Sequence, residues 1–319
     1  PPIVQVGKIH DFMLAAYIKI TSRELSMGKV ESSIGIFVAL AIGLLISIAG
    51  SQGGAEFEGI PVFFLCAILA FSIQWLAYVP AYIAHSEIYY DLTGSMTYLA
   101  VIALALISHM SLSDDLSQRT ILIALLCGLW AMRLGSFLFL RVKKAGSDRR
   151  FNKMKYNALQ FLMTWTIQGL WVIVTLSAGL AAMTSSVDTP LGILAYLGAA
   201  LWLAGFSIEV ISDRQKSIFR DNDESGFIQT GLWSWSRHPN YFGEILLWLG
   251  IAIIAYPTLE GWRMLTLISP IFVFVLLVFV SGVKMLEKSA LRRWGDDEAY
   301  VAYLERTSIL FPLPPSQKR

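Results

Sequence analysis

The residues Ser234 to Glu244, SWSRHPNYFGE, concentrate polar groups at the start of a wholly apolar stretch. Pro239 suits the first turn of a helix, because its missing N–H has no intrahelical partner there. A helix that begins near Pro239 directs its unpaired N–H groups and the positive end of its dipole towards the residues before it. Arg237 and His238 add hydrogen-bond donors beside that end. This combination indicates a site for an anion such as a pyrophosphate.

The residues that follow Pro239 extend the pattern into the helix. Asn240, Glu244 and Trp248 recur at steps of four residues, so they share one face. Asn240 and Glu244 can form hydrogen bonds with an amide or a ribose. The plainer alternative is that Arg237 and His238 anchor at lipid headgroups, and residue type alone does not separate the two interpretations.

Charged residues inside apolar segments are costly in lipid unless they are paired or hydrated, which marks them as functional candidates. Arg133 and Arg141 lie eight residues apart, along one stripe of a predicted helix. Instead of binding a ligand, Arg133 can have a structural role as the ion-pair partner of Glu209 or of Asp91. The basic loop 141–155 is either a topology signal or a wall of the site. A polar cavity that opens to the cytoplasm accounts for the placement of these groups.

The segment SIEVISDRQKSIFR carries Glu209, Asp213, Lys216 and Arg220 at steps of three and four residues. This spacing predicts one charged face on a helix that continues beyond the membrane.

The elements that must position these groups are membrane helices. The chain has 319 residues, of which 55% are hydrophobic and 15% charged, and a mean hydropathy of +0.60. Soluble domains carry about 25% charged residues, so the composition predicts a polytopic integral membrane protein of the all-α class. Eight apolar windows are candidates for spans that cross a bilayer, and the shortest, Tyr241–Tyr256, is expected to form a hairpin with Met264–Val283. The eight windows are Ile34–Gly50, Ile60–Ala84, Leu92–Met110, Thr120–Leu140, Asn157–Ala182, Pro190–Ile211, Tyr241–Tyr256 and Met264–Val283.

Positive charges cluster in the loops 141–155 and 214–237 and after residue 284, and acidic residues mark the alternate loops. The positive-inside rule then places both termini and the cavity on the cytoplasmic side. We expect residues 1–33 to form an N-terminal cytoplasmic or interfacial segment and residues 34–319 to form one membrane domain. The net charge of +2 does not suggest a nucleic-acid partner, and no spacing of His residues suggests a metal site.

The C-terminal half reads SDRQKSIFRDNDESGFIQTGLWSWSRHPNYFGEILLWLG, and later EKSALRRWGDDEAYVAYLERTSILFP. Over about residues 130–312, the chain resembles the C-terminal domain of the steroid 5α-reductases, above all their bacterial relatives of unknown function. The resemblance implies a seven-helix membrane core that binds NADPH in a cytoplasm-facing cavity without a Rossmann unit. The first of the eight spans is then an addition to that core.

Matched residue by residue, the resemblance assigns Asn240, Glu244 and Trp248 to the nicotinamide half of the cofactor. It assigns Asp213 and Arg220 to the phosphate and adenosine side. Glu209 stands where the steroid 5α-reductases have an Asn. The predicted cofactor-binding residues are Arg133, Arg141, Arg149, Glu209, Asp213, Arg220, Arg237, His238, Asn240, Tyr241, Glu244, Trp248 and Tyr300.

The steroid 5α-reductases place a Gln-Glu pair and a Tyr at the substrate carbonyl, and this chain has no Gln-Glu dipeptide. The resemblance implies hydride transfer from NADPH to the β-carbon of a conjugated C=C–C=O in a lipophilic substrate, a steroid or another enone. Charge then develops on the carbonyl oxygen. We expect Tyr90 to donate a hydrogen bond to this oxygen, and Glu87 and Asp91 to orient Tyr90 or to supply the proton.

Two other functions stay open. Isoprenylcysteine and phospholipid methyltransferases, which use S-adenosylmethionine, share the RHPxYFG motif. They carry a Glu-Glu pair in the tail, where this chain has Glu287 followed by Lys288. A non-enzymatic membrane scaffold would leave Arg133, Glu209 and Glu244 as costly burials without a purpose. The residues therefore favour the reductase.

Overall fold

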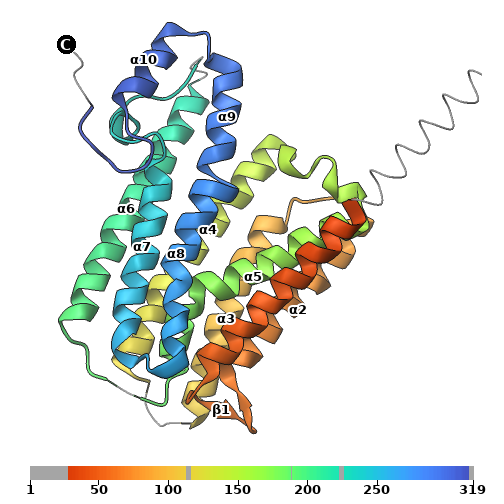
Figure 1. Cartoon of the computed structure of the whole chain (residues 1–319), viewed down its shortest axis with the longest axis vertical. Helices are drawn as coiled ribbons and strands as arrows, with labels where there is room; N and C mark the ends of the chain where they lie inside the picture. Colours follow the sequence, from red (N-terminus) through yellow and green to blue (C-terminus); the bar gives the residue numbers. More distant parts are fainter. Residues whose placement is uncertain (1–27, 113–115, 188, 223–225, 316–319) are drawn as a thin grey trace, which may run out of the picture.

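The computed structural model describes residues 28–112, 116–187, 189–222 and 226–315 (Figure 1). Most of the predicted N-terminal segment, residues 1–27, lies outside this description. Residues 28–33, which we had assigned to that segment, instead form the first six residues of the helix Gly28–Ser51. The first span is therefore longer than the apolar window that predicted it.

Eight helices of the described chain are long and apolar enough to cross a membrane, which confirms the all-α, multi-pass prediction. Most of the chain outside them forms short connections. In order, the spans are the helix Gly28–Ser51, α2 (Val62–Ile83), α3 (Tyr90–Leu112), α4 (Gln118–Ala145), α5 (Ala158–Met183), α6 (Ile193–Asp221), α7 (Pro239–Ala255) and a broken last span from Gly261 to Trp294.

The helix ends follow from local sequence signals. The Ser117 side chain accepts a hydrogen bond from the backbone N–H of Thr120 at the start of α4, and Asn157 accepts one from Gln160 at the start of α5. Gly146 ends α4 in the left-handed conformation, with φ 78°, which glycine adopts without a steric penalty. As predicted, Pro239 is the first residue of α7.

Helix α5 lies at the centre of the bundle, and its apolar residues are buried almost all round. It packs against α2 and α3 on one side and against α7 and α8 (Ile268–Val275) on the other. Figure 1 shows α2, α3 and α5 in one half of the molecule and α6, α7 and α8 in the other. Helix α5 therefore packs against helices of both halves.

The last span is not a continuous α-helix. A 3-10 segment, Gly261–Leu267, leads into α8, and a π-helical turn, Leu276–Val280, follows it. The chain then bends at Ser281 and Gly282 before α9 (Val283–Trp294) and α10 (Glu298–Arg306). π-helical turns are frequent at functional sites because they redirect the helix that follows. Here the turn sends α9 over the ends of α6 and α7 (Figure 1).

The end of the bundle opposite α10 is closed by a small hairpin and two buried arginines. The hairpin pairs β1 (Glu56–Phe57) with β2 (Ile60–Pro61). Arg119 donates to the backbone oxygens of Ile254, Thr189 and Pro190. Arg263 donates to the Ala181 oxygen and to the Ser185 hydroxyl. Both side chains therefore tie helix ends and loops together through main-chain oxygens.

Candidate functional site

The site begins with an unusually close contact between α6 and α7. A Cβ added at Gly205 would lie 2.5 Å from the backbone oxygen of Gly243, and one at Gly243 would lie 2.5 Å from the oxygen of Gly205. Gly198 and Gly250 repeat this reciprocal contact seven residues further along each helix. Only glycine permits such an approach, because any side chain would enter the opposing backbone. The contact sets Glu209 beside the first turns of α7.

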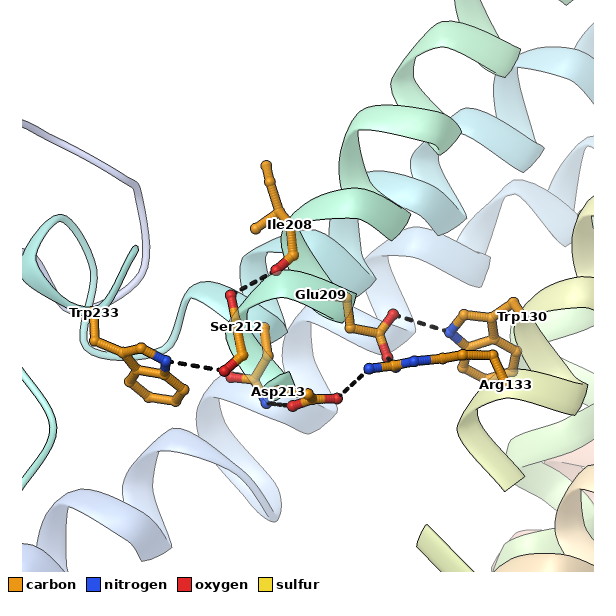
Figure 2. A network of polar contacts seen from close by, with 8 residues as sticks. Trp130, Arg133, Ile208, Glu209, Ser212, Asp213 and Trp233 are labelled. Atoms are coloured by element: carbon orange, nitrogen blue, oxygen red, sulfur yellow. Dashed lines mark hydrogen bonds and ion pairs between the residues drawn. The ribbon is translucent and has the colours of Figure 1, made fainter. Parts of the chain in front are cut away.

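Arg133 of α4 connects to this contact through two acids of α6 (Figure 2). Its guanidinium lies 2.5 Å from Glu209 Oε1 and 2.6 Å from Asp213 Oδ2. The indole Nε1 of Trp130 donates to Glu209 Oε2 at 3.2 Å, and the Asn240 amide donates to Asp213 Oδ1 at 3.4 Å. The structure therefore gives Arg133 the Glu209 partner that we had considered, adds Asp213 as a second, and joins α4, α6 and α7.

Glu244 and Trp248 lie deeper on the same face of α7. Glu244 is 8% exposed, and its carboxyl group has no hydrogen bond or ion pair within the described part of the chain. It lies within electrostatic reach of Glu209, Asp213 and Arg133. The Trp248 ring meets the Trp130 ring edge to face, with ring centroids 4.9 Å apart, and Trp248 Nε1 is buried with no hydrogen-bond partner among the described residues. The inner end of the site is thus acidic and aromatic.

The outer end of the site is a cavity of about 340 Å³ between the end of α6, the loop before α7, α9 and α10. Aromatic rings of Phe227, Trp294 and Tyr300 form part of its wall, with the Phe227 and Tyr300 ring centroids 4.8 Å apart. Its basic lining residues are Lys216, Arg220, Arg237, His238 and Arg293. Phosphate oxygens are bound by such guanidinium and ammonium groups.

Glu287 of α9 holds the Arg-His pair of the RHPNYFGE motif. Its carboxylate lies 2.7 Å from Arg237 Nη1 and 2.8 Å from His238 Nε2. Burial lowers the pKa of His238 below its ordinary value, although the hydrogen bond to Glu287 opposes this shift. His238 is therefore neutral near pH 7, and Nε2 carries the proton that it donates to Glu287. Arg237 Nε and His238 Nδ1 are buried without partners among the described residues.

Tyr303 of α10 lines the cavity, and the C-terminal tail after it contacts the loop before α7. The Tyr303 hydroxyl donates to the backbone oxygen of Trp233 at 2.8 Å. The Ser236 hydroxyl donates to the Leu310 oxygen at 2.8 Å, and the Arg237 N–H donates to the Ser308 oxygen at 2.8 Å. The tail therefore fixes the loop that carries Arg237 and His238.

The basic loop after α4 lies beside this region. Arg141 is within electrostatic reach of Lys216, Arg220, Tyr241 and Asp91. These interactions bring the predicted residues Arg141 and Tyr241 close to each other, and Arg141 close to the basic residues of α6. The Arg149 backbone forms a 3-10 turn, and its side chain lies outside the described residues.

The three predicted catalytic residues have partners within the chain. The Glu87 carboxylate accepts hydrogen bonds from Lys155 Nζ and from the Asp148 N–H, both at 2.8 Å. The Tyr90 hydroxyl donates to the Thr164 backbone oxygen at 3.0 Å. Asp91 lies 3.7 Å from the Arg150 guanidinium, so Arg150 takes the place of the predicted partner Arg133. In this arrangement the two acids hold the loop 146–157 against the start of α3.

Sequence reasoning did not include Glu287, Lys216 and Trp130 among the site residues. Lys216 was predicted to lie on the charged face of α6 but not to be a site residue, and Trp130 lies three residues before Arg133, so helical spacing could have added both. No local signal links Glu287 to Arg237, because they are 50 residues apart and meet only through the bend before α9.

Comparison with known proteins gives a family match and two partial relatives. Residues 77–307 match the family described as "Protein of unknown function (DUF1295)". An uncharacterized protein of Schizosaccharomyces pombe is 22% identical over 228 residues, 61% of this chain and 64% of that protein. 3-oxo-5-alpha-steroid 4-dehydrogenase 1 of Bos taurus is 36% identical over 67 residues, 20% of this chain and 26% of the bovine protein. The matches thus cover less than two thirds of either relative. No solved structure matches the chain.

Proposed function

This chain belongs to the DUF1295 family of proteins of unknown function, and on that premise we propose that it is a membrane-embedded, NADPH-dependent reductase. The proposed reaction reduces the conjugated C=C of a lipophilic enone. The bovine relative, whose name states a dehydrogenase of 3-oxo-5-alpha-steroids, supports this reaction class. The assignment to the bacterial-type branch of the steroid 5α-reductases, and the position of the site on the cytoplasmic side, are parts of the same proposal.

The observation that carries the proposal is the basic, aromatic cavity at the RHPNYFGE motif. Among the described residues that line it are four basic side chains, those of Lys216, Arg220, Arg237 and Arg293, and one carboxylate, that of Glu287. A cavity of about 340 Å³ lies in the range of small-molecule sites. Arg237 Nε and His238 Nδ1, which are buried without a partner in the described part of the chain, leave hydrogen-bonding capacity that a ligand can use once the wall adjusts. The donor set therefore fits the phosphates and the adenine of a dinucleotide.

Each group of residues has a distinct proposed role. Lys216, Arg220, Arg237 and Arg293 hold phosphates, and Arg141, within electrostatic reach of Lys216 and Arg220, adds a further cation on the side of the loop after α4. The rings of Phe227, Trp294 and Tyr300 stack on the adenine. Asn240, Glu244 and Trp248 face the nicotinamide end. When bound, NADPH supplies the hydride.

The substrate side of the proposal rests on the start of α3. Tyr90 is the proposed hydrogen-bond donor to the substrate carbonyl, and this role requires its hydroxyl to turn from the Thr164 oxygen to the substrate. Asp91 and Glu87 orient the region through Arg150 and Lys155. A lipophilic substrate can reach such a site through the bilayer.

A thermal-shift experiment on the purified protein tests the function. NADPH should raise the melting temperature, because a ligand that binds only the folded state stabilises it. S-adenosylmethionine should not. Arg220→Gln should remove most of the NADPH shift, whereas Lys153→Gln, an exposed lysine outside the cavity, should preserve it. A shift with S-adenosylmethionine and none with NADPH would favour the methyltransferase instead.

A further inference from the structure

Helix α9 has a second face, opposite the one that lines the cavity. The cavity face carries Glu287 and Arg293. At about 3.6 residues per turn, Lys284, Lys288 and Arg292 lie on the opposite side of the helix, at steps of four residues. All three side chains are exposed, and none forms an ion pair with a residue that the structure describes. We call this side the outer face of α9.

The outer face combines positive charge with apolar surface. Met285 and Leu291 border the three cations on either side, with exposed fractions of 57% and 50%. The helix holds one acidic residue, Glu287, which binds Arg237 and His238 on the cavity side. No acid of α9 therefore neutralises the outer face. Such a combination suits a membrane interface that contains anionic lipids, where apolar groups and negative headgroups meet.

The last span places the outer face at the level of the lipid headgroups. Every exposed residue from Met264 to Val280 is apolar, which suits contact with hydrocarbon. The next exposed charge is that of Lys284, just after the bend, where α9 leads from α8 towards the end with α10 (Figure 1). The hydrocarbon layer therefore ends close to the first turn of α9.

The length of the outer face matches the thickness of a headgroup layer. Lys284 and Lys288 are about 6 Å apart along the axis, at about 1.5 Å per residue, and one headgroup layer is about 5–8 Å thick. Arg292 lies one turn further from the hydrocarbon. Its long side chain can reach back to the same layer, because side chains on a helix point towards the N-terminus. All three cations can therefore contact lipid phosphates.

We propose that the outer face of α9 binds the headgroup of an anionic phospholipid. Lys284, Lys288 and Arg292 bind its phosphate oxygens, and Met285 and Leu291 contact the acyl chains beside the headgroup. A zwitterionic lipid binds less well, because its own cation neutralises the phosphate. None of these five residues lines the cavity, so this surface is separate from the proposed cofactor site.

Native mass spectrometry of the purified full-length protein in detergent tests the proposal. The protein is titrated with phosphatidylglycerol or with phosphatidylcholine of the same acyl chains, and without NADPH. The wild type should bind phosphatidylglycerol about tenfold more tightly. The combined variant Lys284→Gln, Lys288→Gln and Arg292→Gln should lose this preference and bind phosphatidylcholine as the wild type does. Because the three side chains are exposed, its melting temperature without lipid should equal that of the wild type.

The matched control removes the same number of charges from exposed positions at the end of α4 and in the loop after it. It combines Lys143→Gln, Lys144→Gln and Lys153→Gln, and should keep the preference for phosphatidylglycerol. An equal loss in this control would overturn the proposal, because the preference would then report net charge alone.

Three further results would also overturn the proposal. The first is equal affinity of the wild type for the two lipids. The second is displacement of phosphatidylglycerol by an equal concentration of inorganic phosphate, which would make the outer face a site for free anions. The third is a dimer that forms without lipid and is absent from the α9 variant, which would assign the outer face to a second copy of the chain.

Discussion

At the scale of single residues, the site is held by buried ion pairs rather than by surface ones. Arg133 is 16% exposed in its side chain, and its two acidic partners are 3% and 11% exposed. Removing one member of a buried pair is costly, because the remaining charge keeps its desolvation penalty without a partner. Exposed pairs contribute little, because water screens them.

Replacement of Arg133 should therefore have a large effect on stability. We expect Arg133→Gln to destabilise the protein by about 3 kcal/mol, through the two unpaired acids that remain. Lys144→Gln is the matched control, because Lys144 and Asp221 form an ion pair with side chains 73% and 58% exposed. Thermal unfolding in detergent checks both variants. Equal melting temperatures for Arg133→Gln and the wild type would contradict the ion-pair assignment.

Glu87 predicts a pH dependence of stability. Burial tends to raise its pKa, but the hydrogen bonds from Lys155 and Asp148 outweigh this and hold the pKa below the ordinary value of 4.5. An acid whose pKa is lower in the folded state stabilises the fold above its unfolded pKa. This stability is lost as the pH falls through 4.5 towards the folded pKa.

The corresponding experiment compares melting temperatures from pH 7 down to pH 4 in the wild type and in Glu87→Gln. The difference between them should be constant near neutrality and should shrink as the pH falls below about 5, because Gln cannot titrate. Subtracting the variant removes the contributions of other carboxylates, Asp148 among them, whose pKa is also lowered. A difference that does not change with pH would exclude an ionised Glu87 from the stability of this loop.

The sequence correctly predicted which residues share a helix face where those residues recur at helical spacing. The steps of four residues through Asn240, Glu244 and Trp248 correctly predicted one face of one helix. The pairing of Glu287 with Arg237 could not be predicted, because it depends on a bend between two helices. The assignment of NADPH to these residues stays a prediction.

At the scale of elements, the glycine contact between α6 and α7 has the largest consequence for the site. Gly205→Ala places a methyl group 2.5 Å from the Gly243 backbone oxygen, and main chain cannot move aside as a flexible side chain can. We expect destabilisation by about 1–3 kcal/mol and weaker NADPH binding, because Glu209 moves away from Glu244. Gly192→Ala is the control, since a Cβ at Gly192 has no atom within 4 Å. Melting temperature and nucleotide titration check both.

The helices themselves could be predicted from apolar length, but two of their details could not. The last span appears in the sequence as one apolar window, Met264–Val283, whereas the chain there passes through 3-10, α and π geometry. The window gives no sign of this, because all three geometries bury similar apolar side chains. The close approach of α6 and α7 depends on glycines seven residues apart, Gly198 and Gly205 on α6 and Gly243 and Gly250 on α7. This spacing could be interpreted only after the structure had shown that the two helices are neighbours.

At the scale of the whole molecule, the fold separates two ends that differ in chemistry. The end with α9 and α10 carries the cavity, and the end with the β1–β2 hairpin is closed by Arg119 and Arg263. Composition predicted a membrane protein, and charge bias predicted which loops share a side. The composition could not predict which helices are neighbours, because every span is apolar.

The arrangement predicts which sites label from the same side of a membrane. Cys66 and Cys127 are both buried, so an introduced cysteine reports alone. Glu298→Cys and Lys144→Cys should react with an impermeant maleimide from one side of sealed vesicles, and Glu58→Cys from the other. With the cytoplasmic orientation proposed above, the first two react in inside-out vesicles. Labelling of Glu58→Cys together with Glu298→Cys would contradict the topology.

Arg119 and Arg263, the two buried arginines at the end of the bundle opposite α10, also restrict the relative motion of the helices. Arg119 ties the start of α4 to the end of α7, and Arg263 ties the last span to the end of α5, each through hydrogen bonds from a buried guanidinium to main-chain oxygens. Helices that are held together at one end of a bundle can move apart only at the other end. Fluctuations of this molecule should therefore be widest at the end beside α9, which is where the proposed nucleotide would enter and leave, and smallest at the end that carries Arg119 and Arg263.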